Sequence, residues 1–425
     1  MLTNFKRIGT TTARSCLAAL LLAVVSSHAF GQSGFTRQII ITPQTPGTCG
    51  FADPTTVVWL NDRLFVGQQN GKIHVFTLGP NLNVTSVKCV NTIYDRDPVN
   101  HRLLTGMAFG PYFSSSSAAI GPDLYVSHSD GRICDPNVDT NSGTVTKLIA
   151  SSGYQTAADV AKGLPRSLGD HAPNGLALGP DGLLYLAVGG NTNAGLPGGP
   201  CFDIPEVPKG AAILKIDYAG NVSTYATGLR NAFDLIWHSN GQLYANDNGP
   251  NSGLGNAPDP ATCGPPGFDP GTLTDELNRI VAGRYYGHPN PSRGECVHNG
   301  GPNYVAPIHA YGTNTSSNGI TEYASSLIPG FQGNLFTANW VANDIIRLQL
   351  SPDGKTVMSA SVFSSGYVNP IDVTASADTF FIAEHGADRI TALRWIYTTD
   401  TARLTPTAGG ALLPSRRGLR ARGPR

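Results

Sequence analysis

The feature that most constrains the fold is a short apolar strand that recurs six times along the chain. Each copy ends in a small or polar residue, and most copies follow a polar turn. The first four copies lie roughly 60 residues apart, which is typical of a repeated structural unit. The copies are LFVG at Leu64, LYVS at Leu124, LYLA at Leu184, LYAN at Leu243, LFTA at Leu335 and FFIA at Phe380.

The repeat predicts an all-β protein, a six-bladed β-propeller with four-stranded antiparallel blades around a central channel. Glycine and proline are abundant and charged residues are sparse, which suits short strands joined by tight turns. We expect one domain over residues 32–396. Loops from every blade converge on the channel of such a ring, so residues far apart in the sequence can form one site.

Both ends of the chain differ from this body. Basic residues precede the apolar stretch 16–25, and the small residues Ala29 and Gly31 follow it. This pattern predicts a signal peptide over residues 1–31 and a secreted or periplasmic protein. No later segment is long and apolar enough to span a membrane. Residues 397–425 lose the alternation and are rich in threonine, alanine, glycine and arginine, so we expect a disordered basic tail.

The formal net charge of zero conceals a separation of charge. Without the three basic residues of the leader and the five arginines between residues 416 and 425, 21 basic residues face 29 acidic ones. The body is therefore acidic, which argues against a nucleic-acid partner and suits a calcium-binding exported protein.

Six cysteines remain after the leader, an even number that predicts three disulfides in an oxidising compartment. Proximity in the sequence favours Cys263 with Cys296 and Cys49 with Cys89, but the sequence leaves the pairing open. The spacings contain no CxxC pair of the kind found in zinc or redox sites. The six are Cys49, Cys89, Cys134, Cys201, Cys263 and Cys296.

Polar residues gather where certain strands begin and end. Asp170 and His171 precede one expected strand, where a histidine facing the channel could act as a general base beside a carboxylate. Arg230 and Asn231 precede another, and an arginine beside an amide suits the oxygens of a planar anion. Either pair alone would more often belong to an ordinary surface loop.

A third group follows the fourth recurrent strand. Gly249 and Pro250 form a tight turn whose backbone carbonyls could bind a hard cation such as calcium. The acidic segment DELN, with Glu276, comes shortly after the Pro/Gly-rich stretch 251–270, which we expect to be an insertion at the wall of the channel.

Several segments together resemble a known family. The segments GLPRSLGDH, LALGPDGLLYLAVGG, GLRNAFDLIWHSNGQLYANDNGPN and DELNRI are similar to the soluble quinoprotein glucose and aldose-sugar dehydrogenases. LLTGMAFGPYF and LNDRLFVGQQNGKIHVF extend the resemblance, which covers residues 52–395 and is strongest between residues 163 and 287. The resemblance implies a six-bladed propeller that uses pyrroloquinoline quinone (PQQ) and calcium.

The same resemblance implies roles for individual residues. His171 matches the base that takes the proton of the sugar's anomeric hydroxyl, and Asp170 matches the carboxylate beside it. Arg230 matches the arginine at the quinone oxygens, and Asn231 matches an amide that binds the cofactor. Gly249 and Pro250 match the carbonyl ligands of the cofactor's calcium. Glu276 lies where the family has an acidic residue of a structural calcium site.

The chain also departs from the family pattern. His101 stands where the glucose-oxidising members carry a glutamine beside the cofactor, and Gly190 followed by Asn191 replaces an aspartate. We count His101 and Asn191 among the candidate cofactor-binding residues. Val341 falls near the position of a lysine, and residues 366–369 replace two arginines, so three positive partners of the cofactor carboxylates are missing.

These observations predict an exported PQQ-dependent oxidoreductase that oxidises the anomeric carbon of an aldose, or a related alcohol or aldehyde, and passes electrons to an external acceptor. Two alternatives stay open. One is a propeller that binds a sugar or a protein without catalysis. The other is a calcium-dependent hydrolase of the lactonase type, which would need carboxylates and amides around an axial metal.

Overall fold

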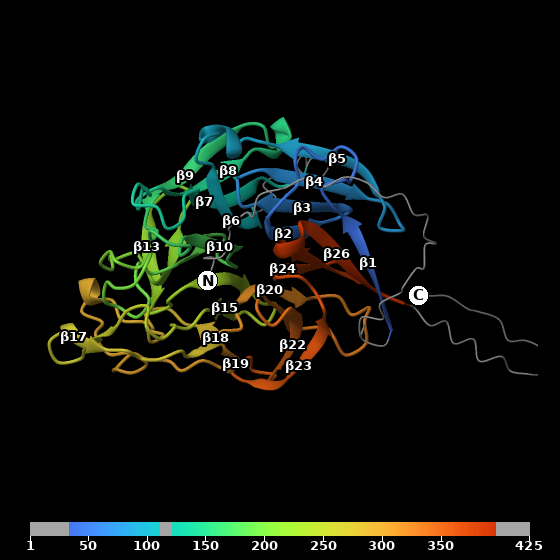
Figure 1. Cartoon of the computed structure of the whole chain (residues 1–425). Coiled ribbons are helices and arrows are strands. Elements are labelled where there is room, and N and C mark those ends of the chain that lie inside the picture. Colours follow the sequence, from blue (N-terminus) through green and yellow to red (C-terminus); the bar gives the residue numbers. More distant parts are fainter. Residues whose placement is uncertain (1–33, 111–120, 397–425) are drawn as a thin grey trace, which may run out of the picture.

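Six four-stranded antiparallel sheets form a ring in the computed structural model of the chain (Figure 1). The structure describes residues 34–110 and 121–396. The predicted leader and the predicted basic tail lie outside these residues. The prediction of a six-bladed β-propeller is confirmed.

Each blade is built from four strands, and the chain runs through the blades in order. The first three blades contain β2 (Pro54–Leu60), β3 (Arg63–Gln68), β4 (Ile73–Leu78) and β5 (Val84–Val90); β6 (Arg102–Phe109), β7 (Leu124–Asp130), β8 (Gly143–Leu148) and β9 (Ala157–Leu164); and β10 (Pro173–Leu178), β11 (Leu184–Val188), β12 (Ala212–Ile216) and β13 (Val222–Thr227).

The other three blades contain β14 (Ala232–Trp237), β15 (Leu243–Asp247), β18 (Thr274–Ile280) and β19 (His309–Thr313); β20 (Ser317–Tyr323), β21 (Asn334–Asn339), β22 (Asp344–Leu350) and β23 (Val357–Ser365); and β24 (Pro370–Ala375), β25 (Thr379–Glu384), β26 (Arg389–Trp395) and β1 (Phe35–Ile41). A hairpin of β16 (Ala257–Asp259) and β17 (Gly264–Phe268) projects from the fourth blade (Figure 1). The described helical turns are short: η1 (Tyr94–Arg96), η2 (Ala150–Ser152), η3 (Pro291–Arg293) and η4 (His385–Ala387).

The six recurrent segments of the sequence form the second strand of each blade: β3, β7, β11, β15, β21 and β25. These strands are buried on both faces because each blade is packed between two others. In β11, Leu184 and Leu186 belong to one core cluster, whereas Tyr185 and Ala187 belong to the next. The alternation of side chains along a strand thus fills two inter-blade cores at once.

The ring closes through the N-terminal strand. β1 pairs with β26, and Phe35 lies opposite Trp395 in the register. This pairing completes the sixth blade with strands from both ends of the described chain, blue beside red in Figure 1. Closing the ring in this way holds the first and last blades together and so fixes the central channel.

The first strand of every blade carries a register shift near its start. A β-bulge re-aims side chains that would otherwise alternate strictly between the two faces of a strand. Residues at the starts of these strands are thereby free to face the channel.

Three disulfides lie among the described residues: Cys49–Cys89, Cys134–Cys201 and Cys263–Cys296. The two pairings favoured by sequence proximity are confirmed. Cys263–Cys296 ties the β16–β17 hairpin to the loop before β19, and Cys134–Cys201 joins loops of the second and third blades.

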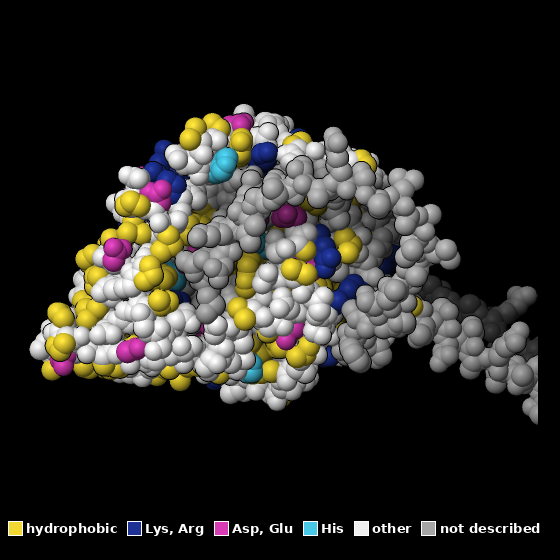
Figure 2. All heavy atoms as spheres, in the orientation of Figure 1, with side chains coloured by type: hydrophobic (Ala, Val, Ile, Leu, Met, Phe, Trp, Pro, Cys, Tyr) yellow, Lys and Arg dark blue, Asp and Glu magenta, His cyan; other side chains and the backbone are white. Residues whose placement is uncertain are grey.

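No helix in residues 34–110 or 121–396 is long and apolar enough to cross a membrane. On the face shown in Figure 2, charged side chains are scattered, and neutral or hydrophobic groups cover most of the described surface.

Candidate active site

A cavity at one end of the channel receives residues from all six blades. Its walls come mostly from the start of the first strand of a blade, from the segment just before it and from the segment after the second strand, because these parts lie at the same end of the ring. One lining residue from each blade, in chain order, is Gln69, Thr105, His171, Asn231, Asn318 and Ile371.

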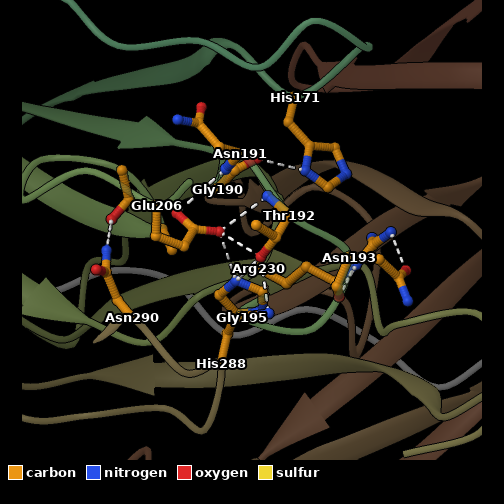
Figure 3. Close-up of polar contacts among 12 residues, drawn as sticks. His171, Gly190, Asn191, Thr192, Asn193, Gly195, Glu206, Arg230, His288 and Asn290 are labelled. Carbon is orange, nitrogen blue, oxygen red and sulfur yellow. Dashed lines mark hydrogen bonds and ion pairs between the residues drawn. The ribbon is translucent and has the colours of Figure 1, made fainter. Parts of the chain in front are cut away.

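His171 lies at the entry to β10 and is 2% exposed. Its Nδ1 atom lies 2.8 Å from the carbonyl oxygen of Gly190 (Figure 3). A carbonyl can only accept a hydrogen bond, so Nδ1 must carry the hydrogen. Nε2 of the neutral ring is therefore the proton acceptor of His171.

The electrostatic surroundings keep this ring neutral. Burial and the nearby charge of Arg230 lower the pKa of His171 to about 3. Both effects disfavour the imidazolium ion, since desolvation penalises the charged form and Arg230 carries the same sign. A neutral imidazole is the form that can accept a proton from a substrate.

Arg230 precedes β14, and backbone and side-chain oxygens hold its guanidinium. Its Nε donates to the Asn193 carbonyl at 3.0 Å, and Nη2 donates to the Asn193 Oδ1 at 2.9 Å. Nη1 donates to the Asn248 carbonyl at 3.1 Å. These oxygens are neutral, so the positive charge of Arg230 is oriented without a direct carboxylate partner among these contacts.

Phe202 lies against both of these residues. Its ring centroid is 4.8 Å from that of His171, and the guanidinium carbon of Arg230 is 5.8 Å from the same centroid. Cys201, the preceding residue, is bonded to Cys134. The disulfide thus anchors an aromatic side chain that lines the cavity and shields the imidazole from water.

A second, smaller pocket adjoins the cavity beneath Arg230 and Gly249, which line both. It is also lined by Pro250 and by the carboxylates of Asp247 and Glu276, which face each other across the β15–β18 ladder. Burial raises the pKa of Asp247 to about 7. Burial, and then the charge of Asp247, raise the pKa of Glu276 to about 8.

Carboxylates with raised pKa values beside backbone carbonyls form a donor set that suits a hard divalent cation. The buried Oδ1 of Asn248, which lines both pockets, has no hydrogen-bond partner among the described residues. A buried acceptor without a partner is costly, and a ligand that fills these pockets could satisfy it.

Two acidic residues fix the loops that carry the candidate groups. Asp247 accepts the backbone N–H groups of Arg230 and Asn231 at 3.0 and 2.8 Å. Asp275 accepts the N–H of Gly249 at 2.8 Å. These contacts hold segments from the fourth blade at the rim in a defined conformation.

The structure brings most of the predicted site residues together. Asp170, His171, Arg230, Asn231 and Gly249 line the cavity. The other two candidate metal ligands, at positions 250 and 276, line the adjoining pocket.

His101 and Asn191 do not line either pocket. The ring of His101 stacks on Tyr94, with 5.2 Å between centroids. The Asn191 amide donates to the Pro205 carbonyl at 2.7 Å and so braces the loop after β11.

Sequence reasoning missed several lining residues. Gln69 follows the second strand of its blade, as Gly249 does, so its place in the repeat was the available signal. Phe202 lies in an irregular loop with no such signal. Among the other lining residues that the sequence did not single out are Asn248, Asn314, Ser316, Asn318 and His385.

The side of the cavity formed by the fifth and sixth blades is neutral. Of the lysines and arginines within the described part of the chain, Arg230 is the one that lines the cavity. Val341, 41% exposed, follows the lining residue Trp340. Arg389 is paired with Glu384 at 2.7 Å, away from the lining.

Comparisons with known proteins agree with this arrangement. The family model for Glucose / Sorbosone dehydrogenase matches residues 51–390. A search of the curated proteins found no match.

Solved structures similar to this chain include several dehydrogenases. A putative oxidoreductase (glucose dehydrogenase) from Thermus thermophilus is 20% identical, with a TM-score of 0.58, over 85% of this chain and all of that one. PQQ-bound aldose sugar dehydrogenase from Streptomyces coelicolor is 19% identical, with a TM-score of 0.59, over 86% and 99%.

The third is the holo form of the pyranose dehydrogenase PQQ domain from Coprinopsis cinerea, 15% identical with a TM-score of 0.57, over 86% and 96%. At these low sequence identities, the structural similarity establishes the fold alone. The family model covers most of the chain, and the chain therefore belongs to the glucose/sorbosone dehydrogenase family.

Proposed function

We propose that this protein is an exported oxidoreductase that oxidises the anomeric carbon of an aldose, or a related alcohol or aldehyde, with PQQ as hydride acceptor and calcium as its metal. The observation that carries the proposal is that His171 and Arg230 line one cavity and are held by one backbone segment, residues 190–193. Membership of the family supports the reaction class. The three disulfides support an oxidising compartment.

His171 is the general base of this proposal. The Gly190 carbonyl holds Nδ1–H, so Nε2 carries the lone pair that accepts the proton of the anomeric hydroxyl. The low pKa of the ring keeps it free of a proton before substrate binds. Asp170 also lines the cavity and in this proposal would contact the sugar hydroxyls.

Arg230 supplies positive charge close to His171, since both side chains lie against the Phe202 ring. Its contacts with Asn193 and Asn248 orient the guanidinium before the reaction begins, so no reorganisation is needed as negative charge develops on an acceptor oxygen. When bound, PQQ supplies a quinone that takes up two electrons with the hydride, and calcium supplies a Lewis acid that polarises it.

The residues of the fourth blade fit the metal. The carbonyl oxygens of Gly249 and Pro250, with the carboxylates of Asp247 and Glu276 behind them, would hold calcium. Asn231 and Asn248 line the cavity and would contact the cofactor; the Asn248 Oδ1 has no hydrogen-bond partner within residues 34–110 and 121–396.

The cofactor carboxylates would meet neutral groups on the opposite side. Asn314, Asn318 and Trp340 line that wall. Arg347 lies over the Phe331 ring at 4.0 Å, and the Lys355 ammonium is 3.6 Å from Asp353, so neither supplies the missing charge. We therefore expect calcium to contribute a larger share of cofactor binding than it would in a site with cations on both sides.

A reconstitution experiment tests the proposal. Calorimetry of the purified protein with PQQ should detect binding in the presence of calcium and little without it. The loaded protein should then reduce a dye with aldose as the electron donor. Absence of quinone binding at saturating calcium would exclude the proposal.

The neutral wall favours a second candidate function, a propeller that binds a sugar without oxidising it. In that case a sugar should bind calorimetrically while the quinone does not. Lactone hydrolysis measured without quinone distinguishes the remaining alternative, a calcium-dependent hydrolase.

A further inference from the structure

Glu206 is a buried carboxylate in the loop between β11 and β12, and the proposed reaction gives it no role. Its residue is 5% exposed, and it lines neither pocket. It nevertheless lies beside residues 190–192, part of the segment that holds both His171 and Arg230 (Figure 3).

The carboxylate accepts four hydrogen bonds. Its Oε2 accepts the N–H of Asn191 at 3.2 Å. Its Oε1 accepts the N–H and the hydroxyl of Thr192 at 2.9 and 2.6 Å. The Nε2 atom of His288 lies 3.0 Å from the same oxygen.

An ionised carboxylate in the protein interior is stable only when strong hydrogen-bond or charged partners surround it, and these four contacts supply such partners to Glu206. Burial by itself raises the pKa of Glu206, but the hydrogen bonds and charge of His288 and the bonds from Thr192 outweigh it and lower the pKa. Glu206 is thus ionised at neutral pH, and its negative charge strengthens each bond that it accepts.

The segment that Glu206 holds contacts His171 on one side and Arg230 on the other. The Gly190 carbonyl accepts from His171, and the Gly190 N–H donates to the Arg230 carbonyl at 2.7 Å. Asn193 accepts twice from the Arg230 guanidinium. The segment is irregular, with no strand ladder of its own to satisfy its backbone groups.

Gly190 and Glu206 are also matched in shape. A Cβ atom on residue 190 would lie 2.8 Å from Glu206 Oε1 and 3.1 Å from His288 Nε2. The carboxylate of Glu206 therefore occupies the space that a side chain at position 190 would need.

We propose that Glu206, paired with His288, is a positioning residue that fixes residues 190–193 and through them sets the orientation of both His171 and Arg230. It contacts neither the cavity nor any group that we expect to react. Its effect on turnover rests on the proposed function, whereas its effect on the imidazole of His171 does not.

The test compares Glu206→Gln with Glu322→Gln. Glu322 forms another largely buried pair with a histidine, His238, at 3.5 Å, and it lies outside the cavity lining. The control therefore removes a similar charge without touching residues 190–193. In Glu206→Gln one carboxylate oxygen becomes an NH2 group, which cannot accept from the donors that face it.

Nitrogen-15 NMR of the histidine side chains gives a readout that needs no cofactor, with His171 identified by the signal lost in His171→Gln. In the unaltered protein and in Glu322→Gln, we expect the tautomer with the proton on Nδ1. In Glu206→Gln we expect a mixture of tautomers. If Glu206→Gln does not fold, Thr192→Val removes one bond to the carboxylate and should shift the signal less, in the same direction.

Kinetics of the quinone-loaded protein give the second readout. We expect kcat in Glu206→Gln to fall roughly ten- to a hundredfold, because displacement of reacting groups by about 1 Å costs rate more than binding. KM for the sugar should change little. A His171 signal and a kcat equal to those of Glu322→Gln would overturn the proposal. If the unaltered protein binds no quinone, the proposed function fails, and the NMR comparison still decides the role of Glu206.

Discussion

The Nδ1–H of His171 is held by a neutral partner, the carbonyl oxygen of Gly190, at 2.8 Å. A carboxylate in this place would stabilise a protonated ring, whereas a carbonyl fixes its orientation with less effect on its charge. The imidazole therefore has a fixed orientation and a free Nε2 lone pair, as the proposed role of His171 requires.

Replacing the base should abolish most of the reaction. In His171→Ala, we expect sugar oxidation by the quinone-loaded protein to fall by on the order of a hundredfold or more, since proton removal from the hydroxyl loses its acceptor. Calcium binding and the melting temperature should stay close to those of the unaltered protein. His309→Ala, at a histidine outside the cavity lining, is the control and should retain full activity. Unchanged turnover in His171→Ala would mean that another group is the base.

Restoring a side chain at position 190 should be harmful. Gly190→Asp places a Cβ within 2.8 Å of Glu206 Oε1 and adds a second negative charge beside it. We expect the melting temperature to fall by several degrees and activity to fall with it, because the buried carboxylates repel each other. At Gly264 the nearest atom to an added Cβ is 3.9 Å away, so Gly264→Ala should be tolerated. Higher activity in Gly190→Asp would contradict this account.

Calcium should stabilise the protein through the carboxylate of Glu276. At a calcium concentration of about 100 times its Kd, binding to the folded state alone adds about 2.7 kcal/mol to the free energy of unfolding. Glu276→Gln should weaken calcium binding about tenfold or more, as measured by calorimetry, and reduce the rise in melting temperature. Glu295→Gln, at a residue paired with Arg293 and outside both pockets, should respond to calcium as the unaltered protein does.

Added charge at the neutral wall should improve cofactor binding. Val341→Lys places an ammonium group next to Trp340, where it can approach a cofactor carboxylate. We expect the affinity for PQQ, measured by calorimetry, to rise about tenfold. This is the lower end of the gain from a charge-assisted hydrogen bond, because the site is partly exposed. Met358→Lys makes the same change of charge on the exposed outer strand β23 and should leave affinity unchanged. Equal affinities in the two variants would show that the cofactor carboxylates lie elsewhere.

Stability should depend on pH through two inner-strand aspartates. Asp234 accepts the N–H of Ile320 at 3.1 Å, and Asp372 accepts that of Val57 at 2.7 Å, so each joins its blade to the next. Burial raises the pKa of Asp234 to about 7. Burial, and then the charge of Asp234, raise the pKa of Asp372 well above its ordinary value.

Folded-state pKa values above the unfolded ones mean that the folded protein holds protons that the unfolded chain releases. The contribution of these protons to the free energy of unfolding is fully present below about pH 4 and is lost as the pH rises toward 7. The free energy of unfolding then falls by up to about 1.4 kcal/mol per pH unit for each proton. In Asp234→Asn this loss should be smaller in urea unfolding between pH 4 and 7. Asp217→Asn alters an exposed turn and should keep the slope of the unaltered protein. An identical slope in Asp234→Asn would show that this group does not hold a proton in the folded state.

The ring of blades follows from the repeated apolar strand, which is readable in the sequence. An apolar strand buried on both faces needs a blade on either side, so six copies such as that at Leu184 predict six stacked sheets. The sequence also indicated His171 and Arg230, because each lies just before the first strand of a blade. The ring brings all such positions to the same end of the channel.

The surroundings of His171 and Arg230 depend instead on contacts between loops of different blades. Glu206, Phe202 and Asn193 lie in irregular loops whose conformations depend on contacts with other blades, such as the Cys134–Cys201 disulfide. No local pattern encodes those contacts, because they join residues far apart in the sequence through backbone groups that every residue carries. The positions of His171 and Arg230 therefore follow from the repeat, whereas the orientation and charge of their side chains follow from the packing of the loops between blades.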